Sequence, residues 1–408
     1  MIRSQLKRTQ GCKKGEPAMK KDSIFEKDSR KKGTKKGELS NQELVSKIEA
    51  LQRERGAALK LTIGLDLGDR SSCYCVLDEK SEVIGRGVVI TEGKEMEQLL
   101  GRLPASVVAL EVGGHSPWVS RLLEKLGHAA IVANARRVKL ISQNSGKNDR
   151  LDAEFLARLA RADQKLLAPI RHRSESAQAD LMGVRVRAQL VELRTETVNA
   201  ARGLVKSFGQ RLAKCDADSL KESHAQDLEP AIRGHIERLL RVVGELTKEI
   251  AACDAELEKL SAERYGEETR RLKQVPMVGP ITSLAYVLTL DDASRFRHSR
   301  DVGCYLGMRP KRDDSGQSQP ELRITKEGDV YLRKLLVQCA QQILSGRGPE
   351  CDLKRWGEKI AAKGKKKAKR RAVVAVARKL AILLHRLWVS GEPYQPRRHQ
   401  QVEQPAAA

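Results

Sequence analysis

The chain has 408 residues, of which 77 are Lys or Arg and 53 are Asp or Glu, so its formal net charge is +24 (77 − 53) at pH 7. This length predicts two or three domains, and the excess of positive charge favours a nucleic-acid partner. Only 3% of the residues are aromatic, which argues against base stacking as the main mode of binding and leaves phosphate contacts as the larger contribution.

The eight cysteines are scattered and form no Cys-x-x-Cys pair, so we expect reduced thiols rather than disulfides or a zinc site. No apolar stretch approaches the roughly 20 residues that span a bilayer, and the first residues lack the apolar core of a signal peptide. We therefore expect a cytoplasmic protein with no membrane partner.

The first half of the chain predicts a basic tail followed by a mixed α/β domain. Residues 1–58 should form a disordered tail, rich in Lys, Gly and Ser, and a short helix from about residue 41. Strands are predicted at 61–67, 72–78 and 82–90, with links short enough for an antiparallel meander. A helix at 93–102, a strand ending at Glu111, a helix at 118–126, a strand at 128–133 and a helix from 149 complete a domain over 59–170. This order resembles that of ribonuclease H-like folds.

Four acidic residues of this domain predict a metal site. Asp66 lies inside a short apolar run that indicates a buried strand, where an unpaired charge is costly and implies a partner. Glu111 ends a second apolar run, and Asp149 and Asp152 are three residues apart, on one face of a helix. Mg²⁺ is held by a few carboxylates together with substrate phosphates. The set predicts a site for two magnesium ions in a nuclease or a strand-transfer enzyme.

Each of these residues alone also has an ordinary explanation. Asp149 or Asp152 fits a solvated helix residue or an N-cap, and Glu111 fits the end of a strand. Asp66 fits the phosphate-binding strand of sugar kinases, actin and heat-shock ATPases, but no second phosphate loop or adenosine-binding glycine pair follows residue 160. The order of all four in one predicted fold favours the metal site.

Residues 171–264 predict a helical coiled-coil segment. Apolar residues alternate by three and four in its second half, at Ile236, Leu239, Val243, Leu246, Ile250, Cys253, Leu257 and Leu260. A similar series runs through its first half, at Val186, Leu190, Leu193, Thr197, Ala200 and Leu204. An antiparallel hairpin within one chain and pairing between subunits both remain open.

Residues 265–392 predict a mostly helical C-terminal domain, with a disordered tail over 393–408. The turn at 275–280, which leads into a helical run at 284–290, resembles the phosphate-binding hairpin of helix-hairpin-helix proteins, although Met277 stands where the first glycine is usual. A polar loop at 311–318 carries the Ser315-Gly316 step. Seven of the nine residues at 363–371 are basic, which is typical of a solvated phosphate-binding face.

The spacing of eight short motifs resembles that of the DEDD-type insertion-sequence transposases, a family that includes the pilin-gene invertases and the bridge-RNA-guided recombinases. The resemblance covers residues 61–390. The motifs are Gly64–Gly68, Leu110–Gly114, Asn134–Val138, Lys147–Ala153, Val275–Pro280, Tyr305–Pro310, Asp314–Gly316 and Ile324–Gly328.

The resemblance implies a RuvC-like domain in which Asp66, Glu111, Asp149 and Asp152 bind magnesium, and a C-terminal transposase domain in which Ser315 is the nucleophile. It further implies donor and target DNA, a noncoding bridge RNA as guide, a dimer or tetramer, and a prokaryotic, nucleoid-associated protein. The chain departs from the family's pattern at Val112, Asn148 and Asp314, and also at Met277 in the turn at 275–280.

Other functions remain as alternatives. A RuvC-like junction resolvase or nuclease would use metal-activated water and would not need Ser315. A scaffold without catalysis would tolerate the loss of any one carboxylate. For the recombinase we expect the carboxylates and Ser315 to meet across two subunits, because about 160 residues and a long helical segment separate Asp152 from Ser315.

Overall fold

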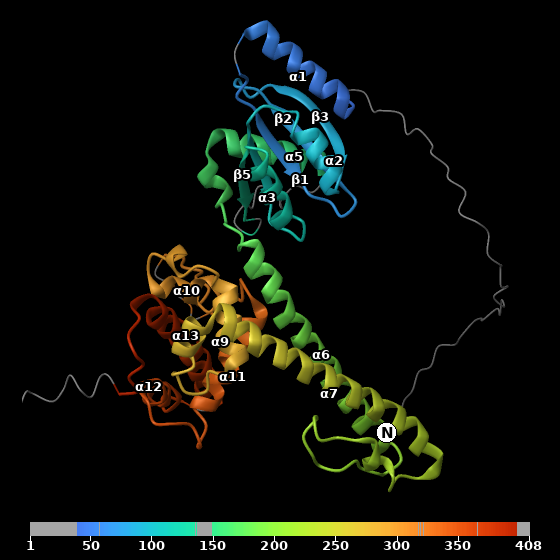
Figure 1. The fold of residues 1–408 in the computed structure, drawn as a ribbon. Coiled ribbons are helices and arrows are strands. Elements are labelled where there is room, and N and C mark those ends of the chain that lie inside the picture. Colours follow the sequence, from blue (N-terminus) through green and yellow to red (C-terminus); the bar gives the residue numbers. More distant parts are fainter. Residues whose placement is uncertain are drawn as a thin grey trace, which may run out of the picture. The chain divides into compact units, whose positions relative to one another are not determined.

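The computed structural model describes residues 39–56, 58–134, 136, 149–316, 318, 320, 322–364 and 366–397. The basic tail up to residue 38, the end of the chain from residue 398, and parts of two predicted motifs, at 135, 137–138 and 147–148, lie outside the described residues. The chain divides into two compact units, Met1–Arg171 and His172–Ala408, and each is described by itself (Figure 1).

The first unit is built on a five-stranded sheet with the strand order β3-β2-β1-β4-β5. Its strands are β1 (Thr62–Asp66), β2 (Ser71–Leu77), β3 (Val83–Ile90), β4 (Val107–Glu111) and β5 (Ala129–Ala133). The first three form the predicted antiparallel meander, while β4 pairs in parallel with both β1 and β5. Parallel neighbours need crossover connections, which here contain α2 (Gly93–Leu100) and α3 (Ser116–Lys125). The predicted mixed α/β domain is confirmed.

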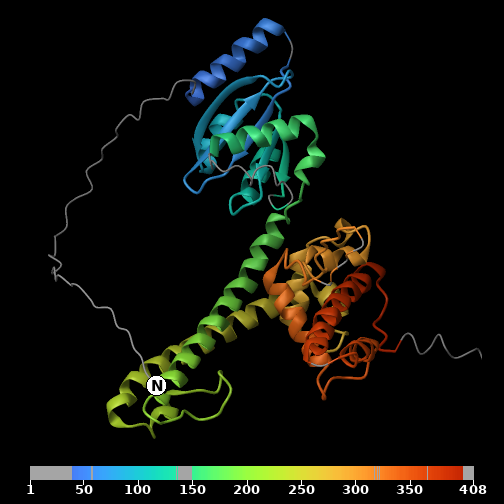
Figure 2. The same ribbon diagram turned by 180° about the vertical axis from the view of Figure 1, so that it is seen from behind.

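Helices cover both faces of this sheet. One face packs against α1 (Asn41–Arg55), α2 and α3, around buried residues that include Ile63, Leu65 and Leu110. The other face is crossed by α5 (Asp149–Ala162) (Figure 2). Ala153 and Ala157 of this helix pack against β2. Small side chains on α5 let the helix lie close to the strands. The arrangement is consistent with the RuvC-like fold that the sequence predicts.

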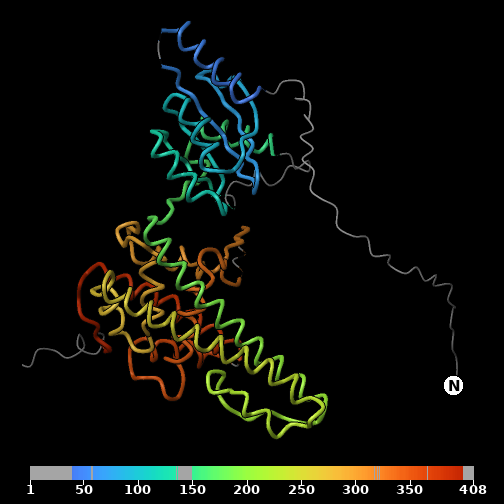
Figure 3. The backbone as a smooth tube through the Cα atoms, turned by 45° about the vertical axis from the view of Figure 1, so that its right-hand side comes forward, coloured from blue at the N-terminus to red at the C-terminus, as the bar shows by residue number. Residues whose placement is uncertain are grey.

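The second unit begins with two long helices, α6 (Glu175–Lys206) and α7 (Pro230–Arg264), joined through a 3-10 turn, η2 (Glu222–Ala225). They run side by side as an antiparallel hairpin within one chain (Figure 3). On α7 the predicted seam is buried at every seventh residue, at Ile236, Val243, Ile250 and Leu257. Of the two arrangements left open by the sequence, the structure shows the hairpin.

The apolar series predicted for α6 does not pack against α7 within the chain. Val186, Leu193 and Leu204 are 49%, 41% and 56% exposed, although they follow a heptad spacing. The helix instead buries another face. Ala177, Leu181 and Val184 pack in the core of the C-terminal helices, and Val198, Ala201 and Val205 pack in a cluster with α7. The apolar side chains of the predicted series therefore remain on the outer surface of α6.

Helices of the C-terminal part pack around one core, which also takes in the beginning of α6. They are α8 (Gly266–Leu272), α9 (Pro280–Leu290), η3 (Ala293–Arg295), α10 (Ser299–Tyr305), α11 (Val330–Ile343), α12 (Asp352–Ala361) and α13 (Lys366–Ser390). Tyr286 of α9 is fully buried, and its hydroxyl donates to the Ala381 carbonyl at 2.7 Å. The predicted helix after the turn at 275–280 is confirmed, and this part of the unit is helical.

Among the described residues, no helix combines the length and the apolar character that crossing a membrane requires.

Candidate functional site

Three of the four predicted carboxylates converge in the first unit. Asp66 ends β1, and Asp149 and Asp152 lie in the first turn of α5. Carboxylate oxygens of these three residues lie within 4.8 Å of one another. Asp66 and Asp152 are half-buried, and Asp149 is exposed. The end of β1 and the N-terminus of α5 thus place three acidic groups together at the carboxyl end of the central strand.

Glu111 does not belong to this group of three, but it lies on the neighbouring strand. Leu65 of β1 is paired with Leu110 of β4 in parallel register, and Asp66 and Glu111 are the next residues along. Side chains at equivalent positions of parallel neighbours project from the same face. Glu111 therefore projects from the face that carries Asp66, in the adjacent strand.

Close contact between β1 and α5 builds the acidic cluster. A Cβ atom on Gly64 would lie 1.8 Å from the Ala153 carbonyl oxygen and 2.6 Å from the Ala157 amide nitrogen. Any larger residue at position 64 would push α5 off the strand. Since Asp66 is two residues beyond Gly64 and Asp152 directly precedes Ala153, this contact fixes the distance between the acidic side chains.

An ion pair fixes the same helix to the edge of the sheet. Glu154 of α5 accepts hydrogen bonds from Arg86 of β3 and, at 2.8 Å, from Arg158 of α5. Burial alone would raise the pKa of Glu154, but the hydrogen bonds and charges of the two arginines outweigh it and hold that pKa below the usual value. Glu154 is thus ionised and paired, and it anchors α5 next to Asp152.

The donor set of the cluster fits a hard divalent cation. Mg²⁺ binds oxygen ligands at about 2.1 Å, so two ligands of one ion lie up to about 4 Å apart. The 4.8 Å limit of the cluster comes close to that span, and small side-chain rotations would bring the oxygens within it. Asp66, Asp149 and Asp152 therefore have the spacing and the ligand atoms of a metal-binding cluster.

Ser315 lies in the second unit, at the tip of a hairpin that we call the serine hairpin, residues 307–328. Backbone bonds close its stem, from Lys311 N to the Arg323 carbonyl, Thr325 N to the Arg309 carbonyl and Lys326 N to the Gly307 carbonyl, all at 2.9 Å. At the tip, Ser315 and Ser318 exchange two backbone hydrogen bonds, at 3.1 and 2.9 Å. The backbone of Ser315 is held by the turn, while the residue itself is exposed.

Exposed charges of both signs lie on the serine hairpin. Asp313 and Asp314 directly precede Ser315, and five cations lie along the two arms, at Arg309, Lys311, Arg312, Arg323 and Lys326. Gly316 follows Ser315 with a φ of +54°, a conformation that glycine adopts without strain and that turns the chain sharply at the tip. The hairpin presents a hydroxyl on an exposed turn, and the cations along its arms suit contacts with phosphates.

A mixed α/β domain with acidic side chains gathered at its strand ends is typical of enzymes that act on phosphodiester bonds. Two transposase family models match the chain. The DEDD transposase model of the IS110 type matches residues 63–209, and the model described as transposase IS116/IS110/IS902 family matches residues 269–353. The first match includes the acidic cluster, and the second includes Ser315.

Similar proteins agree with both matches. A putative transposase y4pF/y4sB of Sinorhizobium fredii is 32% identical over 312 residues, which is 74% of this chain and 77% of the relative. The transposase for insertion sequence element IS1111A of Coxiella burnetii is 28% identical over 340 residues, or 81% and 90% of the two chains. A probable family 20 transposase of Pseudomonas aeruginosa is 29% identical over 304 residues, or 72% and 87%. The chain belongs to the IS116/IS110/IS902 family of transposases, as the sequence motifs predict.

Several residues that shape the site have no clear signal in the sequence. Gly64 falls within a recognised motif, but its close contact with α5 follows only from the packing. Arg86 and Glu154 are 68 positions apart, and a charged residue in a strand or helix usually indicates a solvated face. Their pairing becomes visible only once the sheet and α5 are assembled.

Proposed function

We propose that this transposase cuts and rejoins the DNA of its insertion sequence with two magnesium ions and a nucleophilic serine. In this proposal Asp66, Glu111, Asp149 and Asp152 hold the ions and Ser315 attacks the DNA. The observation that carries the proposal is the convergence of Asp66, Asp149 and Asp152 at the carboxyl end of β1. The exposed Ser315, at the tip of a hairpin with cations along its arms, adds a second chemical group suited to the same reaction.

Each group has a distinct task in this reaction. Divalent ions at the acidic cluster would polarise the scissile phosphate and stabilise the charge on the entering and leaving oxygens. The Ser315 hydroxyl has a high intrinsic pKa and needs such activation to act as a nucleophile. Its Oγ forms a bond to phosphorus as one sugar–phosphate P–O bond breaks, and the proton lost by the serine is balanced by protonation of the leaving sugar oxygen. The product is a phosphoserine ester that a second DNA hydroxyl resolves.

The guide in this proposal is a noncoding bridge RNA that pairs with donor and target DNA. The net charge of +24 and the cations of the serine hairpin support a partner with many phosphates. A further group of basic residues opens α13, at Lys366, Lys367, Lys369, Arg370 and Arg371. Base pairing with the RNA would then select the DNA sequence, and the protein would bind mainly the phosphate backbone.

In the same proposal, residues 59–170 form the RuvC-like domain, 171–264 the assembly segment and 265–392 the transposase domain. The exposed heptad stripe of α6, which includes Val186, Leu193 and Leu204, supports pairing with a second copy of the chain. A dimer or tetramer formed in this way would let the acidic cluster of one subunit act with Ser315 of another.

The experiment places the gene with its flanking noncoding DNA in a host cell and detects excised circular junctions with outward-facing primers. Wild type is compared with Asp66→Asn and Ser315→Ala. Glu92→Gln, an exposed carboxylate outside the cluster, and Ser318→Ala, which keeps the backbone bonds of the turn, are the matched controls. We expect the junction from wild type and both controls, and its loss from the two site variants.

The alternative function gives a different pattern. A resolvase or nuclease that uses metal-activated water would keep its activity in Ser315→Ala and lose it in Asp66→Asn. Retention of the junction by Asp66→Asn would contradict the metal site itself. For the shared site, co-expression of Asp66→Asn with Ser315→Ala should restore the junction, and no recovery would contradict a site composed from two subunits.

A further inference from the structure

The base of the serine hairpin has an unusual backbone. Gly307, Lys326 and Gly328 all have left-handed conformations, with φ angles of +66°, +59° and +78°. A Cβ atom on Gly307 would lie 2.0 Å from the Glu327 carbonyl oxygen, and one on Gly328 would lie 2.0 Å from the Tyr305 carbonyl oxygen. The two arms of the hairpin therefore meet in backbone-to-backbone contact at its base.

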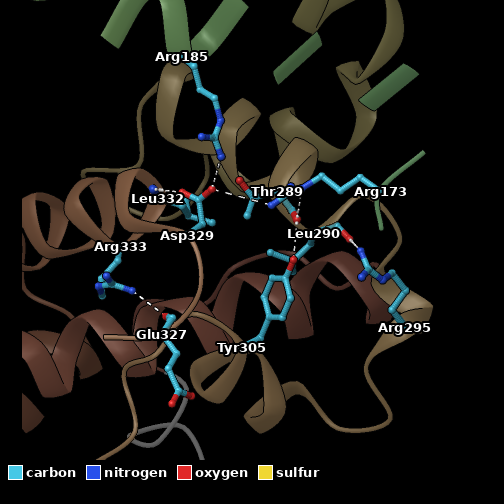
Figure 4. A network of polar contacts seen from close by, with 10 residues as sticks. All are labelled: Arg173, Arg185, Thr289, Leu290, Arg295, Tyr305, Glu327, Asp329, Leu332 and Arg333. Carbon is cyan, nitrogen blue, oxygen red and sulfur yellow. Dashed lines mark hydrogen bonds and ion pairs between the residues drawn. The ribbon is translucent and has the colours of Figure 1, made fainter. Parts of the chain in front are cut away.

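Arg333 of α11 satisfies three of these carbonyl groups. Its Nη1 donates to the Leu306 carbonyl at 2.8 Å and to the Glu327 carbonyl at 2.9 Å, and its Nη2 donates to the Lys326 carbonyl at 3.1 Å. Figure 4 shows this guanidinium beside Glu327, at the base of the hairpin. Because Leu306 adjoins one arm and the other two residues belong to the opposite arm, a single planar group joins both arms.

The guanidinium is itself held by the core of the second unit. Arg333 is only 9% exposed, and its helix neighbours Leu332 and Leu336 are fully buried. Just before the helix, Asp329 accepts a hydrogen bond from the Leu332 amide at 2.8 Å and pairs with Arg185 of α6 at 2.7 Å (Figure 4). The base of the hairpin is thus fixed to the helices, while the tip with Ser315 projects into solvent.

We propose that Arg333 is a positioning residue for strand cleavage: it joins the two arms of the serine hairpin and so sets the place from which Ser315 attacks. This inference rests on the proposed role of Ser315. A nucleophile reacts efficiently only when its oxygen is held close to the attack geometry, and displacements on the order of 1 Å are costly. Without the guanidinium, three carbonyl groups lose their donor and the left-handed backbone loses its support.

The test compares Arg333→Met and Arg333→Lys with a matched control, Arg233→Met. Arg233 is half-buried and also donates two hydrogen bonds to a backbone carbonyl, that of Leu228, but it lies on α7, outside the hairpin. Hydrogen exchange of the purified full chain is followed at the amides of Lys311, Thr325 and Lys326, which close the stem. Junction yield in cells is measured with the same variants, normalised to the amount of folded protein.

In Arg333→Met we expect about tenfold or faster exchange at the three stem amides, as the loss of a buried hydrogen-bonding partner implies, and a matching loss of junctions. Arg333→Lys should restore part of both, since an ammonium group can still donate to some of the carbonyls. Arg233→Met should change neither the exchange of the stem amides nor the yield of junctions, even if it lowers the melting temperature as much as Arg333→Met does.

Unchanged exchange at the stem amides in Arg333→Met would overturn the inference, and so would faster exchange without any loss of junctions. Failure of the proposed function has a different signature. In that case Ser315→Ala keeps its junctions, whereas the exchange result for Arg333 still reports on the hairpin alone.

Discussion

Gly64 of β1 touches the backbone of Ala153 in α5 so closely that a single added methyl group would lie 1.8 Å from the Ala153 carbonyl oxygen. Gly64 lies two residues before Asp66, and Ala153 directly follows Asp152, so the contact is adjacent to both acidic side chains. The absence of a side chain at position 64 is therefore a condition for the acidic cluster. Gly64 thus acts on the site through the packing of α5 on β1, whereas the carboxylates act as ligands, and substitutions can test the two roles separately.

Gly64→Ala should weaken both the fold and the metal site. Moving α5 off β1 costs about 1–3 kcal/mol of the free energy of unfolding, as is typical of overpacked cores. The same displacement separates Asp66 from Asp152, so binding of Mn²⁺ or Mg²⁺, measured by titration calorimetry, should weaken. Gly93→Ala is the control, because an added Cβ at Gly93 meets nothing within 4 Å. Equal metal binding by Gly64→Ala and wild type would contradict the packing argument.

The Glu154 ion pair predicts a dependence of stability on acid pH. The pKa of Glu154 is lowered in the folded state by Arg86 and Arg158, so the pair stabilises the fold above the unfolded pKa of about 4.3. This stabilisation is lost as pH falls through the lower folded pKa. Glu154→Gln should therefore lower the melting temperature at pH 7 and lose less stability than wild type on acidification, as measured by thermal unfolding from neutral to acid pH. Identical acid profiles would contradict the role of the pair, and Glu92→Gln serves as the exposed control.

Met277 predicts a stabilising substitution. It has a φ of +67° at the turn before α9, where the sequence departs from the glycine usual in phosphate-binding hairpins. A side chain in this conformation is strained, so Met277→Gly should raise the free energy of unfolding by about 0.5–1 kcal/mol, after the entropy cost of glycine is subtracted. Thermal unfolding measures the effect. Lys273→Gly is the control, since Lys273 has a φ of −67° and glycine there should destabilise.

The exposed stripe of α6 predicts a change of assembly. Leu193→Glu places a charge in the middle of the stripe and should reduce the molar mass of the particle in light scattering, because a buried unpaired charge opposes apolar pairing. Asn199→Glu adds the same charge at an exposed polar position of α6 and should leave the assembly intact. A wild type that is monomeric at all concentrations would contradict pairing through this surface.

Much of the first unit was predictable because its signals are local. Short apolar runs closed by turns predict the strands, and Asp149 begins the helix that carries the acidic pair. The convergence of Asp66 with that pair follows from the expected order of elements. Which of the four acidic residues come together could not be predicted. Asp66, Asp149 and Asp152 are brought together by the contact of Gly64 with Ala153, and that contact involves backbone atoms that no side-chain pattern encodes.

The second unit was harder to predict for a physical reason. Its heptad spacing on α6 predicts a buried seam, whereas the hairpin buries smaller side chains such as Ala201 and leaves Leu193 exposed. A repeat of apolar residues shows that a helix has an apolar face, but it does not show which other element of the structure packs against that face. Likewise, Arg333 looks like an ordinary helix cation in sequence, and its three carbonyl partners appear only when the hairpin is folded.

The measurement that tests the central claim most directly is the identification of the DNA-linked residue. Protein is isolated under denaturing conditions from cells that carry the element, and the DNA is digested to short remnants. Trypsin then releases a peptide over residues 313–323, which contains both Ser315 and Ser318. We predict a nucleotide remnant on Ser315 in wild type, and none in Asp66→Asn or Ser315→Ala. Junctions formed without any remnant on this peptide, or with the remnant on Ser318, would contradict the account.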